Sequence, residues 1–451
     1  MTETDKSTDD GQLRRAIGLP YATAMVIGTI IGASIFVQPS EVTGQVPSVA
    51  GVFVVWITAG VLSLFGALVC AELASIYTGS GGVYVYLREA FAPWVGFLWG
   101  WAMFWVMHSG IIAAVAVVFA RYAAYFFPLG EGGTRAVAVA VILVLSAVNY
   151  RGVSQGSALQ AAFTAGKLVA IGAIVVLGLV FGSRAPEHFS GGGPFLATTG
   201  PSEFILAVVA GLFAFGGWHM VTYNAGETVD PRRTIPRALI IGTLVVTGCY
   251  VALNAVYLYV LPVEAVASST RVAADAADAL FGFGGGAAMS ALVMFSTFGA
   301  VSGIILAGPR VYYAMSRDGL LFAEFGRVHP RFQTPHRALV MQAGWSSVLV
   351  LTGTFRELFT RVIYTEWIFF GLLAVGLILL RRRPEVQREY RVWGYPAVPV
   401  VFALSAFAIV TNQILSDPRQ SLIGAAIVLA GLPVYWLWSR NRGPHSTRTH
   451  P

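Results

Sequence analysis

Long runs of apolar residues recur along this chain and leave it few folds to adopt. A helix needs about 18–20 consecutive apolar residues to cross the hydrocarbon core of a bilayer. Hydrophobic residues make up 56% of the chain and charged residues 11%, so the apolar surface exceeds what a soluble domain can bury. Twelve suitable runs lie at 17–38, 49–74, 92–127, 136–150, 159–182, 203–226, 238–261, 284–315, 338–354, 362–380, 397–413 and 421–439. The sequence therefore predicts an all-α polytopic membrane protein with twelve transmembrane helices.

The distribution of charge predicts the orientation. The net charge of +7 comes from Lys and Arg residues scattered among short loops, without a basic domain or a nucleic-acid-binding motif. With the N-terminus in the cytoplasm, the cytoplasmic loops hold about three times as many of these residues as the outer loops. We therefore expect a protein of the plasma membrane with both termini in the cytoplasm and no nucleic-acid partner.

The two cysteines, Cys70 and Cys249, both lie within apolar runs. This position excludes a disulfide framework and a metal site with several cysteine ligands. We expect no metal and no cofactor.

The loops between the apolar runs are short, which argues against a hidden catalytic domain and therefore against a membrane enzyme. A loop rich in Gly, Pro and Ser at 183–202 separates two halves of five runs each. The predicted units are a tail at 1–16, the halves at 17–182 and 203–380, a cytoplasmic loop at 381–396, two further helices at 397–439 and a tail at 440–451. An odd number of spans per half makes the two halves inverted repeats.

The first run of each half carries a helix-breaking stretch. Gly28–Phe36 reads GTIIGASIF and is expected to break near Gly32, and Phe213–Trp218 reads FAFGGW and is expected to break near Gly216. In hydrocarbon, a broken helix is tolerated where its free backbone groups face a cavity, a ligand or other protein. The GxxxG spacing of the first stretch is also compatible with close helix packing. Breaks in corresponding positions of two halves favour a transporter binding site.

Such breaks offer both kinds of backbone group to a ligand. The amides of Ala33 and Ser34 begin a new helix and suit a carboxylate, and the carbonyl of Ile30 ends the one before. In the second break, the carbonyls near Phe213 and Gly216 suit an ammonium group. A zwitterionic α-amino acid matches this pairing. The candidate substrate-binding residues are Ile30, Gly32, Ala33, Ser34, Phe213, Phe215, Gly216 and Trp218.

The side chains near the breaks favour a neutral substrate. Phe213, Phe215 and Trp218 offer apolar walls, although aromatic residues at these positions also serve as lipid-facing or packing residues. Neither break contains an acidic residue, so a cationic substrate side chain lacks an obvious partner there. An acid from another span could still reach the site.

Lys167 lies in the middle of an apolar run, where a lysine costs about 2.5–3.5 kcal/mol on insertion and should face the bundle interior. Its ammonium could take the place of a sodium ion, or the side chain could carry a proton. Snorkelling to the interface is the structural alternative. The hydroxyls of Ser296 and Thr297 could meet Lys167 or bond to their own helix.

Other polar residues in the apolar runs are weaker candidates. Glu72 and Glu227 lie at the ends of spans and are expected to be solvated or to anchor loops. His108 and His219 are isolated and are more typical of packing than of proton transfer, and Glu366 is a lower-ranked candidate proton carrier.

The chain resembles the amino acid, polyamine and organocation (APC) transporter superfamily, and within it the L-type amino acid transporters. The stretches that carry the resemblance are Gly28–Phe36, Phe213–Trp218, Asp230–Arg237, Ser296–Gly299, Arg310–Gly319 and Tyr395–Pro396. The resemblance implies a LeuT-like 5+5 inverted repeat with two C-terminal helices, alternating access and sodium-independent exchange of neutral L-amino acids. It also implies that Lys167 stands at a sodium site. A proton-coupled amino acid or polyamine symporter of the same fold is the alternative.

Two positions depart from the family pattern. Ser34 stands where the family usually has glycine, so its Cβ narrows the expected carboxylate site. Animal members join a glycoprotein subunit through a cysteine in the loop after the third span, and residues 128–135 contain none. We therefore expect a single-chain prokaryotic transporter without a disulfide-linked heavy subunit, with the lipid bilayer and a small amino acid as its partners. A receptor or channel component is a rival class that would bind a ligand without moving it.

Overall fold

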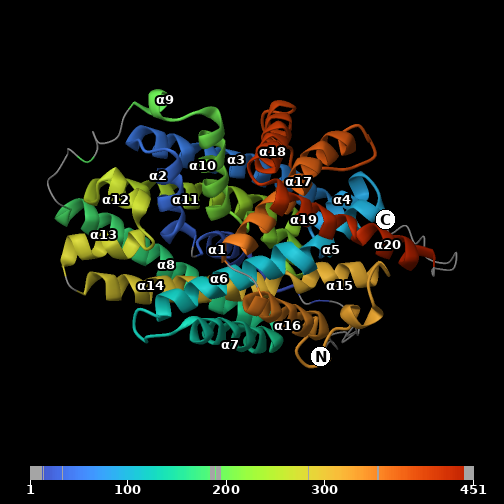
Figure 1. Ribbon diagram of the computed structural model, residues 1–451. Coiled ribbons are helices and arrows are strands. Elements are labelled where there is room, and N and C mark those ends of the chain that lie inside the picture. Colours follow the sequence, from blue (N-terminus) through green and yellow to red (C-terminus); the bar gives the residue numbers. More distant parts are fainter. Residues whose placement is uncertain are drawn as a thin grey trace, which may run out of the picture.

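The computed structural model describes residue 13 and residues 15–32, 34–182, 188, 194–282, 284–352 and 355–440. Every regular element in this part of the chain is a helix (Figure 1). The elements up to residue 181 are α1 Leu19–Ile30, η1 Ser34–Phe36, α2 Gln38–Gln45, α3 Val49–Ile76, α4 Val83–Ala90, α5 Pro93–Ala102, η2 Met103–Met107, α6 His108–Ala123, α7 Glu131–Tyr150 and α8 Val153–Phe181.

The elements after residue 194 continue the helical bundle. They are α9 Phe195–Thr198, α10 Pro201–Ala214, η4 Trp218–Glu227, α11 Pro231–Val260, α12 Val263–Ser268, α13 Val272–Phe281, α14 Gly285–Ala307, α15 Pro309–Arg317, η5 Ala323–Gly326, α16 His336–Thr352, α17 Phe355–Leu380, α18 Ala397–Ser416, α19 Pro418–Leu429 and α20 Gly431–Arg440. Helices α5, α10, α11, α15 and α19 begin at a proline, whose missing N–H has no partner to lose in a first turn.

The helices agree with the predicted class of an all-α polytopic membrane protein. In the described ranges, nine helical segments are long and apolar enough to cross a membrane. The other three predicted runs contain α1, α16 and α17. The run predicted at 136–150 begins earlier, at Glu131, because the polar first turn of α7 continues the apolar helix.

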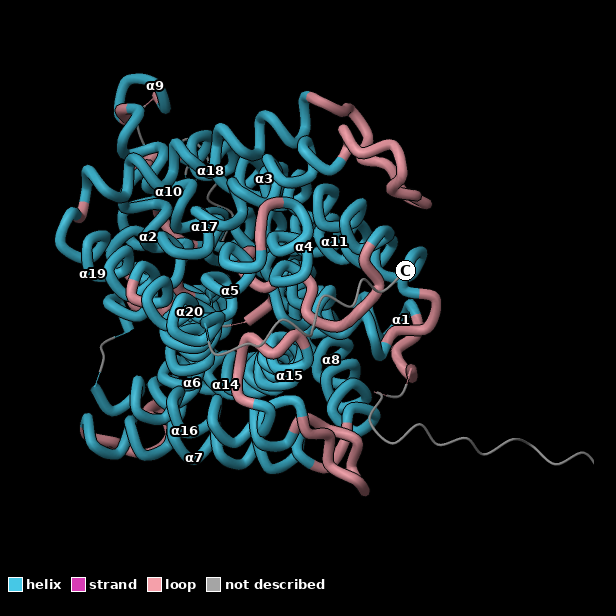
Figure 2. Tube along the Cα trace, turned by 90° about the vertical axis from the view of Figure 1, so that its right-hand side faces the viewer, coloured by secondary structure: helices cyan, strands magenta, loops and turns pink. Residues whose placement is uncertain are grey.

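Helix α1 lies near the middle of the bundle, where it packs against α8, α11 and α14 (Figure 1). The short helices α12 and α13 lie at one end of the long helices, and α4 lies at the other (Figure 1). Figure 2 looks at the bundle from the α4 end, with α7 and α16 together at one edge and α10 and α18 at the opposite edge. The first interrupted helix is therefore enclosed by other helices, and its free backbone groups face protein.

Candidate functional site

Both predicted interruptions are present. Helix α1 ends at Ile30, and Ser34–Phe36 forms one 3-10 turn before α2 begins. Ala33 lies outside the described residues. Helix α10 ends at Ala214, and the chain continues through Gly217, with φ +100°, into a 3-10 helix. The expected half-helices after the breaks are thus 3-10 segments at first. At the first break this agrees with Pro39, the second residue of α2, which has no N–H to donate to the Ile35 carbonyl and so cannot continue the preceding turn.

The two breaks lie side by side. The Thr29 hydroxyl is 3.2 Å from the Gly217 carbonyl oxygen. A Cβ on Gly217 would lie 3.1 Å from the Thr29 carbonyl oxygen, so glycine satisfies both the left-handed φ and the close approach. The Tyr250 hydroxyl of α11 lies 3.0 Å from the Ile30 oxygen and 2.9 Å from the Ala214 oxygen. One buried hydroxyl therefore contacts the last carbonyls of both interrupted helices.

Lys167 of α8 points at the first break. Its ammonium donates to the carbonyl oxygens of Gly28, at 3.0 Å, and Ile31, at 2.7 Å. The residue is 1% exposed, so the side chain does not extend to an interface. The carbonyl end of a helix carries partial negative charge, which a cation stabilises. In its protonated form, Lys167 places a positive charge where α1 stops.

The hydroxyls of α14 do not bond to Lys167. Thr297 donates to the Val293 and Met294 carbonyls of its own helix, at 2.8 and 3.0 Å. Ser296 donates to the Gly32 oxygen at 3.3 Å. The structure therefore favours the local-bonding alternative for Thr297, and it adds Ser296 to the first break.

The aromatic residues of the second break are packed. The Phe215 ring lies 5.0 Å from Tyr250, and the Trp218 ring lies 5.1 Å from Phe370 of α17. Phe213, Phe215 and Trp218 are all buried, which agrees with the packing alternative in this conformation. Ser34 and Gly216 remain half-buried. The accessible surface of the two breaks is therefore small.

An acidic residue from another helix approaches the second break. Glu366 of α17 is 7% exposed. Phe370 follows four residues later, and its ring lies 4.9 Å from that of His219 in η4. Four residues correspond to about 6 Å along a helix. Glu366 therefore lies about one helical turn from the ring that contacts the segment after the break.

The two intramembrane histidines sit in packed surroundings. His108 is 2.8 Å from the Ile304 oxygen of α14. The His219 ring lies within 6 Å of the Trp99, Tyr223 and Phe370 rings. Both positions are consistent with packing residues.

A buried ion pair lies between the breaks and the α4 end of the bundle. Arg310 Nε and Nη2 donate to the Glu227 carboxylate at 2.8 and 3.0 Å, and both side chains are fully buried. The Glu227 carbonyl accepts from the amides of Ala16 and Ile17. The sequence analysis expected Glu227 to be solvated or to anchor a loop and did not pair it with Arg310; the buried carboxylate rules out the solvated alternative. A basic residue inside one apolar run and an acidic residue at the end of another were the available indication, because an unpaired charge is too costly to bury.

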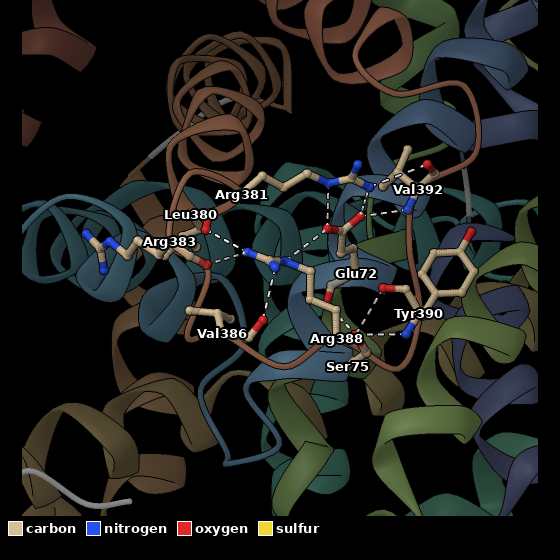
Figure 3. A network of polar contacts seen from close by, with 9 residues as sticks. All are labelled: Glu72, Ser75, Leu380, Arg381, Arg383, Val386, Arg388, Tyr390 and Val392. Carbon is tan, nitrogen blue, oxygen red and sulfur yellow. Dashed lines mark hydrogen bonds and ion pairs between the residues drawn. The ribbon is translucent and has the colours of Figure 1, made fainter.

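Glu72 anchors a loop. Figure 3 shows its carboxylate between the guanidinium groups of Arg381 and Arg388. Arg381 donates to it at 2.8 and 2.5 Å, and the Val392 amide donates at 2.6 Å. The loop after α17 is thereby attached to the end of α3, which is the anchoring alternative for Glu72. The stacking of Arg381 on Tyr395, at 3.8 Å, adds a further contact within this loop.

Tyr250 and Thr29 were missed by the sequence analysis. A tyrosine in the middle of an apolar run must find a hydrogen-bond partner for its hydroxyl, and this requirement is the signal that could have identified Tyr250. The identity of the partner depends on which carbonyls α11 faces, which the sequence does not state.

The comparisons with known proteins agree on one family. The profile of the amino acid permease family matches residues 17–437. The serine/threonine exchanger SteT of Bacillus subtilis is 33% identical over 436 residues, which cover 95% of this chain and 98% of that protein. The human b(0,+)-type amino acid transporter 1 is 32% identical and covers 94% of this chain and 88% of its own length. The human large neutral amino acids transporter small subunit 2 is also 32% identical, over 96% and 83%.

Proposed function

This chain belongs to the amino acid permease family of membrane transporters, and from that membership we propose that it exchanges neutral L-amino acids without sodium. The activity shared by the family and these relatives is amino acid transport and not an enzymatic reaction. We further propose that the halves at 17–182 and 203–380 are inverted repeats that move by alternating access. The membrane is the plasma membrane, with both termini in the cytoplasm.

The observation that carries the proposal is the meeting of the two breaks. Backbone N–H groups at the start of η1 have no partner within that helix, and they suit the substrate carboxylate. The carbonyls at the end of α10 suit the ammonium group. The proposed substrate-binding residues are Ile30, Gly32, Ala33, Ser34, Phe213, Phe215, Gly216 and Trp218. Tyr250 holds the Ile30 oxygen, so it aligns this site from α11.

Lys167 supports the absence of sodium coupling. Its ammonium already occupies two carbonyl oxygens of the first break, which are the hard oxygen ligands that an alkali ion would need. A second cation there would meet direct charge repulsion. Lys167→Ala removes this cation, and we expect slower substrate release or a new response to sodium. Unchanged transport of the variant at every pH and sodium concentration would remove Lys167 from the mechanism.

Counterflow in proteoliposomes tests the exchange. Vesicles loaded with unlabelled serine, or another neutral amino acid, should take up labelled amino acid faster than empty vesicles, equally in sodium and in choline buffers. A competition series of unlabelled amino acids then defines the preferred side chain. Equal uptake by loaded and empty vesicles would contradict exchange, and binding without counterflow would indicate a receptor.

Glu366 favours a second candidate, a proton-coupled symporter of amino acids or polyamines. A buried carboxyl about one helical turn from the ring that contacts the segment after the break could carry a proton or pair with a cationic substrate. In that case, acid outside empty vesicles should drive uptake, and Glu366→Gln should abolish this drive while leaving counterflow intact. Uptake indifferent to the pH gradient in both proteins would leave exchange as the function.

The chain is proposed to work without a disulfide-linked heavy subunit. Cys70 is buried in α3, and Cys249 lies within α11. Neither thiol stands in an external loop where a partner chain could reach it. A single band of unchanged mobility with and without reductant in native membranes is the expected result.

A further inference from the structure

A basic hollow lies where α11 enters the membrane. It has a volume of about 350 Å³ and lies between the first turns of α11 and the loop after α17. We call it the arginine hollow; its lining residues are Arg232, Arg233, Pro236, Arg237, Glu389 and Tyr390. Neither break contributes a residue to it, so it is separate from the proposed substrate site.

The arginine hollow carries an excess of positive charge. Glu389 lies 3.2 Å from Arg232 and 3.6 Å from Arg233. Arg237 forms no ion pair with any acidic residue in the described part of the chain. Three guanidinium groups thus face one carboxylate. An anion with a phosphate group matches this excess, because guanidinium groups bind phosphate through paired hydrogen bonds.

The depth of the hollow matches the headgroup layer of a bilayer. Helix α11 has 30 residues, so at 1.5 Å per residue it is about 45 Å long, against about 30 Å for the hydrocarbon core. The apolar part of α11 begins directly after Arg237. The arginines therefore lie at the polar boundary of the leaflet, on the side of the membrane that we propose to be cytoplasmic.

An exposed apolar stripe continues from Arg237 along the same face of α11. Ile241, Leu244 and Val245 follow at spacings of four, seven and eight residues, which are neighbours on one helix face. They are 44, 52 and 36% exposed. Gly248 extends the stripe, since a Cβ there would meet no atom within 4 Å. A soluble anion would make no contact with this stripe, whereas the acyl chain of a lipid could pack against it.

We propose that the arginine hollow binds the phosphate of an anionic phospholipid, with an acyl chain along the apolar stripe. The occupant is a lipid of the adjacent leaflet, where anionic headgroups attract basic residues. Bound there, the headgroup bridges α11 and the loop after α17. That loop is the segment that Glu72 and Ser75 attach to α3, and Tyr390 itself bonds to Ser75 (Figure 3). The lipid thus joins two segments that the ion pairs of Glu389 with Arg232 and Arg233 also link.

Lipid binding to the purified protein tests the proposal. Native mass spectrometry with phosphatidylglycerol and phosphatidylcholine should show retention of the anionic lipid by the wild-type chain. The double variant R233Q/R237Q should lose about thirtyfold in affinity, from about 1 kcal/mol per arginine at a membrane surface. The matched control R331Q/R382Q removes two exposed arginines outside the hollow and should stay within about twofold.

A variant that binds the lipid more tightly than the wild type is a useful control, because misfolding would weaken binding and not strengthen it. Glu389 competes with a phosphate for Arg232 and Arg233, so E389Q should bind phosphatidylglycerol several-fold more tightly than the wild type. Sodium phosphate or glycerol phosphate at millimolar concentration should not displace the lipid. Equal retention by R233Q/R237Q and the wild type would overturn the site. Displacement by free phosphate would overturn the lipid as its occupant.

Discussion

The buried Glu227–Arg310 pair gives a quantitative prediction. Replacing Arg310 by methionine keeps much of the side-chain volume and removes both donors to the Glu227 carboxylate. It also removes the donor to the Leu306 carbonyl, which lies 2.5 Å from Nη1. The Glu227 carboxylate would then be left without its partner at a position with no exposed surface.

The expected loss of unfolding free energy is about 3–5 kcal/mol, the usual cost of breaking a buried ion pair from one side. The double variant with Glu227→Gln leaves no unpaired buried charge, so its free energy of unfolding should lie within about 2 kcal/mol of the wild-type value. An exposed pair offers a control. Arg327 and Glu324 are 61 and 46% exposed, and Arg327→Met should cost less than about 1 kcal/mol.

Unfolding in mixed micelles with increasing dodecyl sulfate measures these differences, and counterflow is recorded on the same variants in proteoliposomes. The reasoning is refuted if Arg310→Met costs less than about 1 kcal/mol, or if the double variant is as unstable as the single one. A stable double variant that no longer exchanges substrate would instead assign the pair a role in closing the α4 end of the pathway.

Three further predictions follow from the site and its surroundings. Gly217→Ala meets both a φ of +100° and the Thr29 carbonyl, so we expect a loss of about 1–3 kcal/mol in stability and a loss of counterflow. Gly248→Ala, inside α11 with no neighbour to meet, should leave counterflow unchanged and should not lower stability. Tyr250→Phe removes the hydroxyl that reaches both breaks, and we expect substrate affinity to fall about tenfold at normal protein yield; an unchanged KM would contradict the alignment role. Burial, and next the Asp318 carboxylate, raise the pKa of the Tyr84 phenol in α4, so the neutral phenol stabilises the folded state below about pH 10 and this contribution is lost as the pH rises further. Tyr84→Phe should therefore make the free energy of unfolding depend less on pH above about 10. The same pH dependence in the variant and the wild type would refute this.

The fold class and the two breaks could be predicted because they depend on local sequence. Runs of apolar residues give spanning helices whatever their neighbours are, and the glycines at 216 and 217 break a helix by their own conformational freedom. The boundaries were less accurate. Helix α7 begins at Glu131 because a polar first turn can extend into the headgroup layer, which an apolar threshold does not detect.

The partners of the polar residues could not be predicted, because they depend on packing between distant helices. Lys167 was correctly placed in the bundle interior, but the alternative of a contact with Thr297 gave way to the carbonyls of α1. Arg310 and Glu227 are 83 residues apart. Such pairs become predictable only when the arrangement of α15 against η4, and of α8 against α1, is known.

The position of Tyr250 limits how the two halves can rotate against each other in the proposed transport cycle. When one rigid body turns against another, only points on the rotation axis keep their distances to both bodies. The Tyr250 oxygen is within 3.0 Å of the Ile30 and Ala214 carbonyls, one from each of the two proposed halves. If both distances stay the same in the outward-facing and inward-facing states, the rotation axis passes through this oxygen. If one of them lengthens, that hydrogen bond must break in every transport cycle.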